Sequence, residues 1–380
     1  MIYVDYNATA PLRPESRAAI VSAFEVGANP SSIHQQGRQA RHLIETARAE
    51  LAHFIGARAR DIVFTSGGTE ANALALAGTA QQLQGNVTML VSAIEHDAVR
   101  SNATQAALRT ETLRVDSNGV VDLEMLKNRL VIWDVQNDGV PVVAIMLANN
   151  ETGIIQPVRA VVDLVKRYDG FVHCDAVQAL GKIPVDVTAL GVDYLALSAH
   201  KIGGPQGVGA LWVRSGAPLR PLLVGGGQER SLRSGTENLL GIAGFGAACV
   251  AASQTIEFMD ELSVLRDQFE DRLMAAFDIK VFGRAEARLP QTSNFALEGF
   301  SSEIQVMALD LEGIAVSSGA ACSSGKVSRS HVLQAMGVDR GVADCALRAS
   351  FGWASTADDV AQFADVWIAA ARRAVLREKV

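Results

Sequence analysis

The sequence has few cysteines and lacks any segment typical of a signal peptide or a membrane span. Its four cysteines include no Cys-x-x-Cys pair, which argues against a disulfide scaffold and against a zinc knuckle. Residues 1–5 lack the basic start and apolar run of a signal peptide. The longest apolar stretch, residues 239–252, contains three glycines and is shorter than the roughly 20 residues that span a bilayer. We therefore expect a cytoplasmic protein in which this stretch is a buried helix.

The sequence also lacks a long block of basic residues. It has 41 acidic and 34 basic residues and a net charge of −7, so neither nucleic acid nor an anionic membrane is an expected partner. At 49% hydrophobic and 20% charged residues, the chain can bury a large core, which excludes a disordered or fibrous protein. Its 380 residues suit two domains rather than one.

Apolar strand-like runs alternate with helix-like segments as far as about residue 213. This alternation predicts βαβ units and an α/β domain with a mostly parallel sheet. After residue 255 short strands alternate with helices, which predicts a smaller α+β domain. In the first part we expect strands at 61–65, 87–91, 142–147, 171–174 and 194–197 and helices at 38–54 and 70–83; in the second, a helix at 257–277 and further elements at 292–297, 303–311, 315–317, 346–351 and 358–376.

A glycine turn precedes one of the predicted helices. Residues 65–70 read Thr-Ser-Gly-Gly-Thr-Glu, so a strand ends, two glycines turn and a helix begins at a hydroxyl residue. Converging backbone N–H groups at a helix N-terminus favour an anion, and a phosphate would suit this place. A threonine that only caps the helix would account for this sequence equally well.

Two charged residues follow predicted buried strands. Asp175 ends one strand, where burial is costly unless a cation partners the carboxylate; a protonated pyridine nitrogen is one such partner, and a helix cap is the alternative. Lys201 stands between another strand and a Gly-Gly-Pro turn, beside Ser198 and His200. A lysine held in a poorly solvated place can act as an amine nucleophile. Most lysines are solvated surface residues, but this position favours the functional interpretation.

Two further segments combine glycines with reactive or charged residues. Residues 225–236 contain three consecutive glycines, two arginines and hydroxyl side chains, which suit a phosphate or a carboxylate or else form a surface loop. Cys322 lies among small residues close to Lys326, which favours an exposed, reactive thiolate over an inert one. Cys249 differs, because it lies in an apolar run.

A lysine, an acid and a phosphate cradle together describe a site for pyridoxal 5′-phosphate (PLP). With these motifs the sequence resembles the cysteine desulfurases of the NifS/IscS type, within the class V aminotransferase superfamily. The resemblance extends from residue 3 to about residue 352. It is carried by residues 3–11, 65–72, 95–96, 149–153, 175–178, 198–201, 233–236 and 317–322.

The resemblance implies a role for each candidate residue. Lys201 would hold PLP as a Schiff base, His96 would stack on its ring and assist proton transfer, and Cys322 would accept the sulfur. Asn150 and Arg348 would hold the substrate carboxylate. The remaining implied cofactor contacts are Asp175 at the ring nitrogen, Gln178 at the ring hydroxyl, Thr69, Ser198 and His200 at the phosphate, with Glu70 and Asn150 beside them, and Thr236 supplied by a second subunit.

The resemblance also implies the fold and the reaction. The fold would be the PLP-dependent transferase fold type I, with a seven-stranded large domain at residues 14–255 and a small domain formed by residues 1–13 and 256–380. The enzyme, a sulfurtransferase and homodimer, would take sulfur from L-cysteine, leave L-alanine and a persulfide on Cys322, and pass the sulfur to an acceptor protein for iron–sulfur cluster or thio-cofactor assembly. No resident metal is implied, although Cys322 could transiently ligate an iron–sulfur cluster.

Other functions stay open at this point. Selenocysteine cleavage or another class V reaction would use the same fold, but a transaminase has no need of a cysteine such as Cys322. A non-catalytic sulfur-relay scaffold would be expected to lose Lys201, Asp175 or His96, and all three are present.

Overall fold

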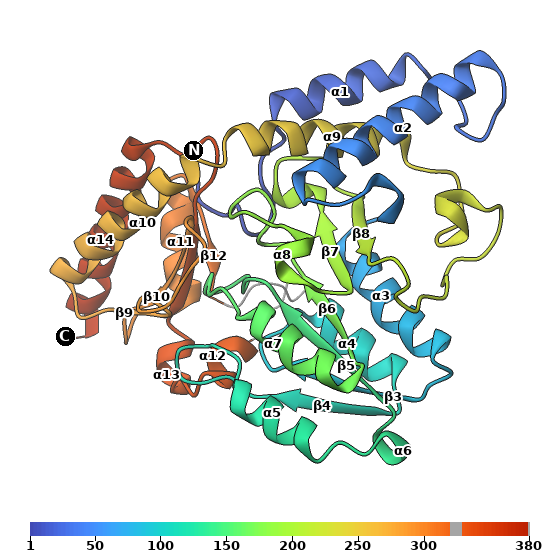
Figure 1. The fold of residues 1–380 in the computed structure, drawn as a ribbon. Coiled ribbons are helices and arrows are strands. Elements are labelled where there is room, and N and C mark those ends of the chain that lie inside the picture. The colour runs from blue at the N-terminus through green and yellow to red at the C-terminus, as the bar shows by residue number, and fades with distance from the viewer. Residues whose placement is uncertain (320–328, 379–380) are drawn as a thin grey trace.

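The computed structural model describes residues 1–319 and 329–378. A large sheet with helices on both faces forms one part of the molecule, and a group of short strands with the C-terminal helices forms the other (Figure 1).

Seven strands form the large sheet, in the order β2-β8-β7-β6-β5-β3-β4. Strands β4, β3, β5, β6 and β7 pair in parallel, whereas β8 is antiparallel to both of its neighbours. The predicted mostly parallel seven-stranded sheet is therefore confirmed. The strands are β2 (Ile62–Thr65), β3 (Val87–Ser92), β4 (Arg109–Leu113), β5 (Val140–Met146), β6 (Phe171–Asp175), β7 (Tyr194–Ser198) and β8 (Gly209–Val213).

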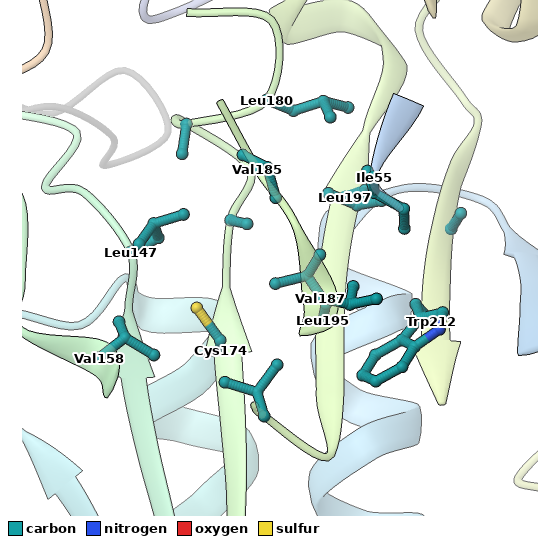
Figure 2. Packing of buried hydrophobic residues seen from close by; sticks show 14 of the residues in the cluster. Ile55, Leu147, Val158, Cys174, Leu180, Val185, Val187, Leu195, Leu197 and Trp212 are labelled. Carbon is teal, nitrogen blue, oxygen red and sulfur yellow. The ribbon is translucent and has the colours of Figure 1, made fainter. Parts of the chain in front are cut away.

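The large sheet is buried on both faces, which is why its strands read as continuous apolar runs. Along β7, Leu195 and Leu197 belong to the core on one face, whereas Tyr194 and Ala196 belong to the core on the other. Figure 2 shows the first of these cores, where Trp212 of β8 lies near Leu195. Each large side chain buried here contributes roughly 1.5–3 kcal/mol to folding.

Helix α9 (Leu239–Gln254) is the buried helix expected from the apolar stretch, and it packs against α1 and α2. Its glycines allow this close packing, since a Cβ at Gly246 would lie 2.6 Å from the Cα of Ala47. The helices of this part are α1 (Pro14–Phe24), α2 (Gln35–Phe54), α3 (Gly68–Gln82), α4 (Asp97–Ala106), α5 (Leu123–Val131), α6 (Val135–Asp138), α7 (Val158–Val165), α8 (Val187–Leu190) and α9.

No single helix of the described chain has the length and apolarity needed to cross a membrane; by those two criteria alone, only α9 together with α10 (Phe258–Ala276), a pair bent by 72°, would qualify.

The second part is built on a four-stranded antiparallel sheet in the order β12-β13-β10-β9. Phe295 of β10 packs there with Phe351 and Trp367, and Ile2 and Val4 from the chain start join the same core. Its elements are β9 (Lys280–Val281), β10 (Thr292–Ala296), β12 (Ser317–Ser318), β13 (Ala346–Ser350), α10, α11 (Ser302–Leu311), α12 (His331–Ala335), α13 (Arg340–Ala343) and α14 (Ala357–Glu378). The domain boundaries given above stay predictions.

One predicted element divides in the structure. The run 315–317 reads as a single strand, but β11 (Ile314–Ala315) and β12 belong to different sheets. Strand β11 pairs in parallel with β1 (Ile2–Tyr3), while β12 pairs with β13. Val316 lies between the two strands, so the chain leaves one sheet and enters the next within a single residue.

Candidate active site

A cavity of about 210 Å³ lies at the carboxyl edge of the large sheet. Met146, Asp175 and Ser198 end β5, β6 and β7, and all three line it. This is the edge at which open α/β sheets bind ligands. The cavity brings together most of the predicted site residues, namely Thr69, His96, Asn150, Asp175, Gln178, Ser198, His200, Lys201 and Arg348.

Lys201 reaches the cavity from a single 3₁₀ turn, η3 (Ala199–Lys201), that follows β7. The next turn requires glycine, because Gly203 has a φ of +84° and a Cβ there would lie 2.6 Å from Cγ of Arg13. The Lys201 Nζ donates hydrogen bonds to the carbonyl oxygens of Asn7 at 2.5 Å and Ala8 at 2.8 Å. The amine is thus half-buried and held against the first residues of the chain.

Asp175 is held by a buried polar network. Its Oδ1 accepts from the backbone N–H of Val177 at 3.0 Å, and its Oδ2 accepts from Asn72 Nδ2 at 2.8 Å. Burial lowers the pKa of His173 to about 3, so its imidazole is neutral. The His173 Nδ1 has no partner among the described residues, so the proton belongs on Nε2, which then donates to Asn72 Oδ1 at 2.8 Å. That contact fixes Asn72 as a donor to Asp175.

One end of the cavity is suited to an anion. Helix α3 begins beside it, and Gly67 caps the helix without a side-chain hydrogen bond, so the first N–H groups keep their capacity to bind an anion. Thr69 and Ser198 add hydroxyl groups. His200 Nδ1 contacts Thr9 Oγ1 at 2.9 Å, and burial, followed by the nearby Lys201 and Lys182, lowers the His200 pKa to about 4.

Arg348 of β13 supplies a buried cation to the same cavity. Its Nη1 donates to the Asn150 carbonyl at 3.1 Å, and its Nη2 pairs with Asp5 at 2.7 Å. Its Nε is buried and has no partner among the described residues. An arginine with donors to spare is well suited to hold a carboxylate.

His96 caps the N-terminus of α4, where its Nδ1 accepts from the backbone N–H of Ala98 at 3.0 Å. In the neutral ring the proton therefore lies on Nε2. The preceding Glu95 is fully buried, and its Oε1 accepts from the Met146 N–H at 2.7 Å. Burial raises the Glu95 pKa well above its usual range.

Three predicted residues do not line the cavity. The Glu70 carboxylate pairs with Arg233 at 2.9 Å and accepts from the Ser66 N–H at 2.7 Å. Thr236 is exposed and does not line the cavity of its own chain. Cys322 lies outside the described residues.

The other three cysteines, Cys174, Cys249 and Cys345, are buried, and burial raises the pKa of each. None of these three described thiols is suited to act as a thiolate at neutral pH. No cluster of metal-ligating side chains occurs within residues 1–319 and 329–378.

Two polar residues of the cavity, Asn7 and Asn72, were not among the predicted site residues. Both belong to segments that carry the family resemblance, residues 3–11 and 65–72, but the resemblance implied no role for either. A signal was present for Asn72, because it is a polar residue on a helix otherwise rich in alanine and leucine. For Asn7 no local pattern gave a signal.

Comparison with known proteins identifies the family. The family model described as aminotransferase class V matches residues 2–363. The cysteine desulfurase IscS of Dictyoglomus turgidum is 41% identical over 375 residues, covering 96% of this chain and 93% of the relative. The chain belongs to the class V aminotransferases. Enzymes of this class depend on PLP, and so does this one.

Solved structures agree with the family assignment. The X-ray structure of a NifS-like protein from Rickettsia africae matches with a TM-score of 0.89 and 35% identity, covering 98% of this chain and 99% of the other. A structure described as SspA in complex with cysteine matches with a TM-score of 0.78 and 28% identity, covering 92% and 99%. The predicted fold type I is confirmed.

The residues of this class V site fit PLP by their chemistry. Asp175 supplies an acceptor for a pyridinium N–H, the α3 N-terminus supplies donors for a phosphate, and Lys201 supplies an amine for an aldehyde.

Proposed function

We propose that this PLP enzyme is a cysteine desulfurase that removes the sulfur of L-cysteine, leaving L-alanine and a persulfide on Cys322. The observation that carries the proposal is one cavity in which an amine, an acid partner for a pyridine nitrogen and a buried guanidinium meet, namely Lys201, Asp175 and Arg348. The cysteine desulfurases that share about 40% identity with nearly the whole chain support it.

The cavity residues divide the work of holding the cofactor. Lys201 would hold its aldehyde carbon, Asp175 its ring nitrogen and Gln178 its ring hydroxyl. The phosphate would lie at the N-terminus of α3, where Thr69, Ser198 and His200 of the same chain would contact it. Thr236 of a second subunit would complete this phosphate site. When bound, PLP supplies an electron sink that stabilises negative charge at the substrate α-carbon.

The remaining steps are performed by the chain's own residues. Arg348 and Asn150 hold the substrate carboxylate and so fix the α-carbon near Lys201. The Lys201 amine would remove the α-proton, and His96 would assist proton transfer from its Nε2. Asp175 keeps the ring nitrogen protonated.

Cys322 is proposed as the sulfur acceptor. Its thiolate attacks the substrate sulfur, so that an S–S bond forms and the substrate C–S bond breaks. The electron pair of the broken bond remains with the carbon skeleton, and a proton then completes alanine. The three buried cysteines support this choice, because none of them is suited to be the thiolate.

The finer aspects of the function are also proposals. We infer a cytoplasmic homodimer that passes the Cys322 persulfide to a sulfur-acceptor protein, and iron–sulfur cluster assembly suits the IscS names of its relatives. The exposure of Thr236 supports the homodimer, since this residue is free to reach a second subunit's site.

Cys322→Ser tests the proposal. The PLP-loaded variant is expected to lose alanine release and persulfide formation, measured by amino-acid analysis and by alkylation followed by mass spectrometry. Cys345→Ala, which removes a buried thiol away from the cavity, serves as the matched control and should keep both. If Cys322→Ser formed persulfide as fast as the wild-type enzyme, Cys322 would not be the sulfur acceptor.

A further inference from the structure

Lys182 is a buried lysine to which the proposed chemistry gives no task. Its exposed fraction is 6%, and it follows Gly181, whose φ of +71° and missing side chain let this turn pack against Ile202. Lys182 does not line the cavity. Burying a lysine costs free energy that a methionine of similar length would not cost. Its presence therefore calls for a physical reason.

The hydrogen bonding of Lys182 gives that reason. Its Nζ donates to Gln178 Oε1 at 2.8 Å, and it has no other hydrogen-bond partner among the described residues. Burial, together with the nearby Lys201 and Arg348, lowers the pKa of Lys182 well below its usual range. Both the ammonium and the neutral amine carry an N–H for this contact, so the hydrogen bond survives a change of charge.

Gln178 is thereby held at both ends of its amide. While Oε1 accepts from Lys182, Nε2 donates to the carbonyl of Asn7 at 2.9 Å, the same carbonyl that accepts from Lys201 Nζ. An amide bound in this way has its NH₂ group toward the first residues of the chain and the cavity. One N–H of that group is used by Asn7, which leaves the second for a ligand.

We propose that Lys182 is a positioning residue that fixes the amide of Gln178 so that an N–H, and not the carbonyl oxygen, faces the ring hydroxyl of the cofactor. The inference rests on the proposed function, in which Gln178 contacts that hydroxyl. Without Lys182 the Gln178 oxygen would be buried without a partner, and the side chain would turn away to regain one.

The test is the pH titration of the visible absorbance band of the PLP-loaded enzyme. The variants are Lys182→Met, which keeps the length of the side chain, Gln178→Leu, and the double variant. The ring hydroxyl oxygen shares a proton with the nitrogen of the Schiff base to Lys201, and a hydrogen-bond donor to this oxygen makes that proton easier to lose. Removal of the donor therefore raises the midpoint of the pH titration. Gln178→Leu should raise it by about one unit, and Lys182→Met should raise it by about half a unit or more.

The double variant separates positioning from charge. If Lys182 acts through Gln178, the midpoint of the double variant equals that of Gln178→Leu alone. If Lys182 acts only through its own charge, the full Lys182→Met shift persists in the Gln178→Leu background, and the proposal is overturned. A wild-type midpoint in Lys182→Met, or in Gln178→Leu, overturns it as well.

Lys166→Met is the matched control for the substitution itself. Lys166 binds Gly170 and Asp193 near the start of β6 and β7, at the far edge of the sheet from the cavity. This variant should keep the wild-type midpoint even if its thermal stability falls. Failure of the wild-type protein to show any visible band with PLP would instead contradict the proposed function, so the two failures are distinguishable.

Discussion

At the scale of single residues, burial sets the protonation of the imidazoles near the cavity. It is the largest cause that lowers the pKa of His173 to about 3 and that of His200 to about 4. Both rings are therefore neutral at pH 7. A neutral His173 can donate to Asn72, and through Asn72 it orients the carboxylate that is proposed to hold the cofactor's ring nitrogen.

This protonation predicts a loss of stability in mild acid. The folded pKa of His173 lies below the unfolded value of about 6.5, so the unfolded state binds the proton first as the pH falls. The stabilisation is complete above pH 6.5 and is lost as the pH falls toward 3. At pH 5 the loss due to His173 should be about 2 kcal/mol.

Urea unfolding at pH 7 and pH 5 measures this loss. Because carboxyl groups also titrate in this range, the comparison is with His173→Asn, in which the difference between the two pH values should shrink by about 2 kcal/mol. His53→Asn, at an exposed position of α2, should leave the difference unchanged. An equal difference in wild type and His173→Asn would contradict the burial argument.

The site residues that could be predicted from the sequence are those whose neighbours in the sequence reveal their position in the fold. Lys201 and Asp175 could be predicted because Asp175 ends one apolar strand and Lys201 comes three residues after another. The carboxyl ends of such strands meet at one edge of the sheet. The role of Asn72 could not be predicted, because a polar residue on an apolar helix indicates burial but not the partner, and that of Lys182 could not, because nothing in the sequence shows that it is buried against Gln178. The partner of Asn72, Asp175, lies 103 residues away in sequence.

At the scale of elements, several uniformly buried strands were predicted correctly, whereas β8, which is equally buried, was not predicted as a strand. Strands β3, β5 and β7 are apolar runs and were located within two residues at each end. Strand β4 was missed because it is the edge strand, and its sequence Arg-Thr-Glu-Thr-Leu is mostly solvent-exposed. A strand with one neighbour need not be apolar, so it gives no hydrophobic signal.

The turn η4 (Gln228–Ser231) stores backbone strain. Three consecutive non-glycine residues, Glu229, Arg230 and Ser231, have φ values of +46°, +58° and +65°. The Glu229 carboxylate anchors the turn, because it forms a buried bidentate pair with Arg48 at 2.6 and 2.7 Å and accepts from the Phe64 N–H at 2.8 Å. The anchor holds in place the segment that leads to Thr236.

Relief of this strain should stabilise the protein. Ser231 is exposed, so Ser231→Gly removes the left-handed strain with little other change and should raise the free energy of unfolding by about 1 kcal/mol. Ser253→Gly, at an exposed position of helix α9, should instead lower it by about 0.5 kcal/mol. Urea unfolding measures both, and a destabilised Ser231→Gly would show that the turn is not strained.

At the scale of the whole molecule, Asn7 joins the two parts of the chain. Its side chain donates to Thr292 Oγ1 at 2.9 Å and to the Asn150 carbonyl at 3.2 Å, and it accepts from Gln291 at 3.1 Å. Its own carbonyl receives Lys201. One buried residue thus connects the strands of the smaller part, the proposed substrate-binding turn and the reactive amine.

Asn7→Ala should therefore weaken more than one property. Loss of these buried hydrogen bonds should lower the free energy of unfolding by about 2–4 kcal/mol, and PLP should dissociate faster from the variant. Urea unfolding and the decay of the visible band after dilution measure the two effects. Asn102→Ala, at a half-buried position of helix α4 outside the cavity, is the control. A variant as stable as wild type would contradict this role.

The pairing of the first residues with the last strand has a consequence for synthesis of the protein. The Asn7 N–H donates to Ser350 Oγ at 2.9 Å, across 343 positions of sequence. At 5–20 residues per second a ribosome needs roughly 20–70 s to add that length. Ser350 lies 149 positions after Lys201, so a nascent chain that already contains Lys201 would lack this contact to Asn7 for roughly 7–30 s. Vitamin B6 phosphate would then be captured only after translation is nearly finished.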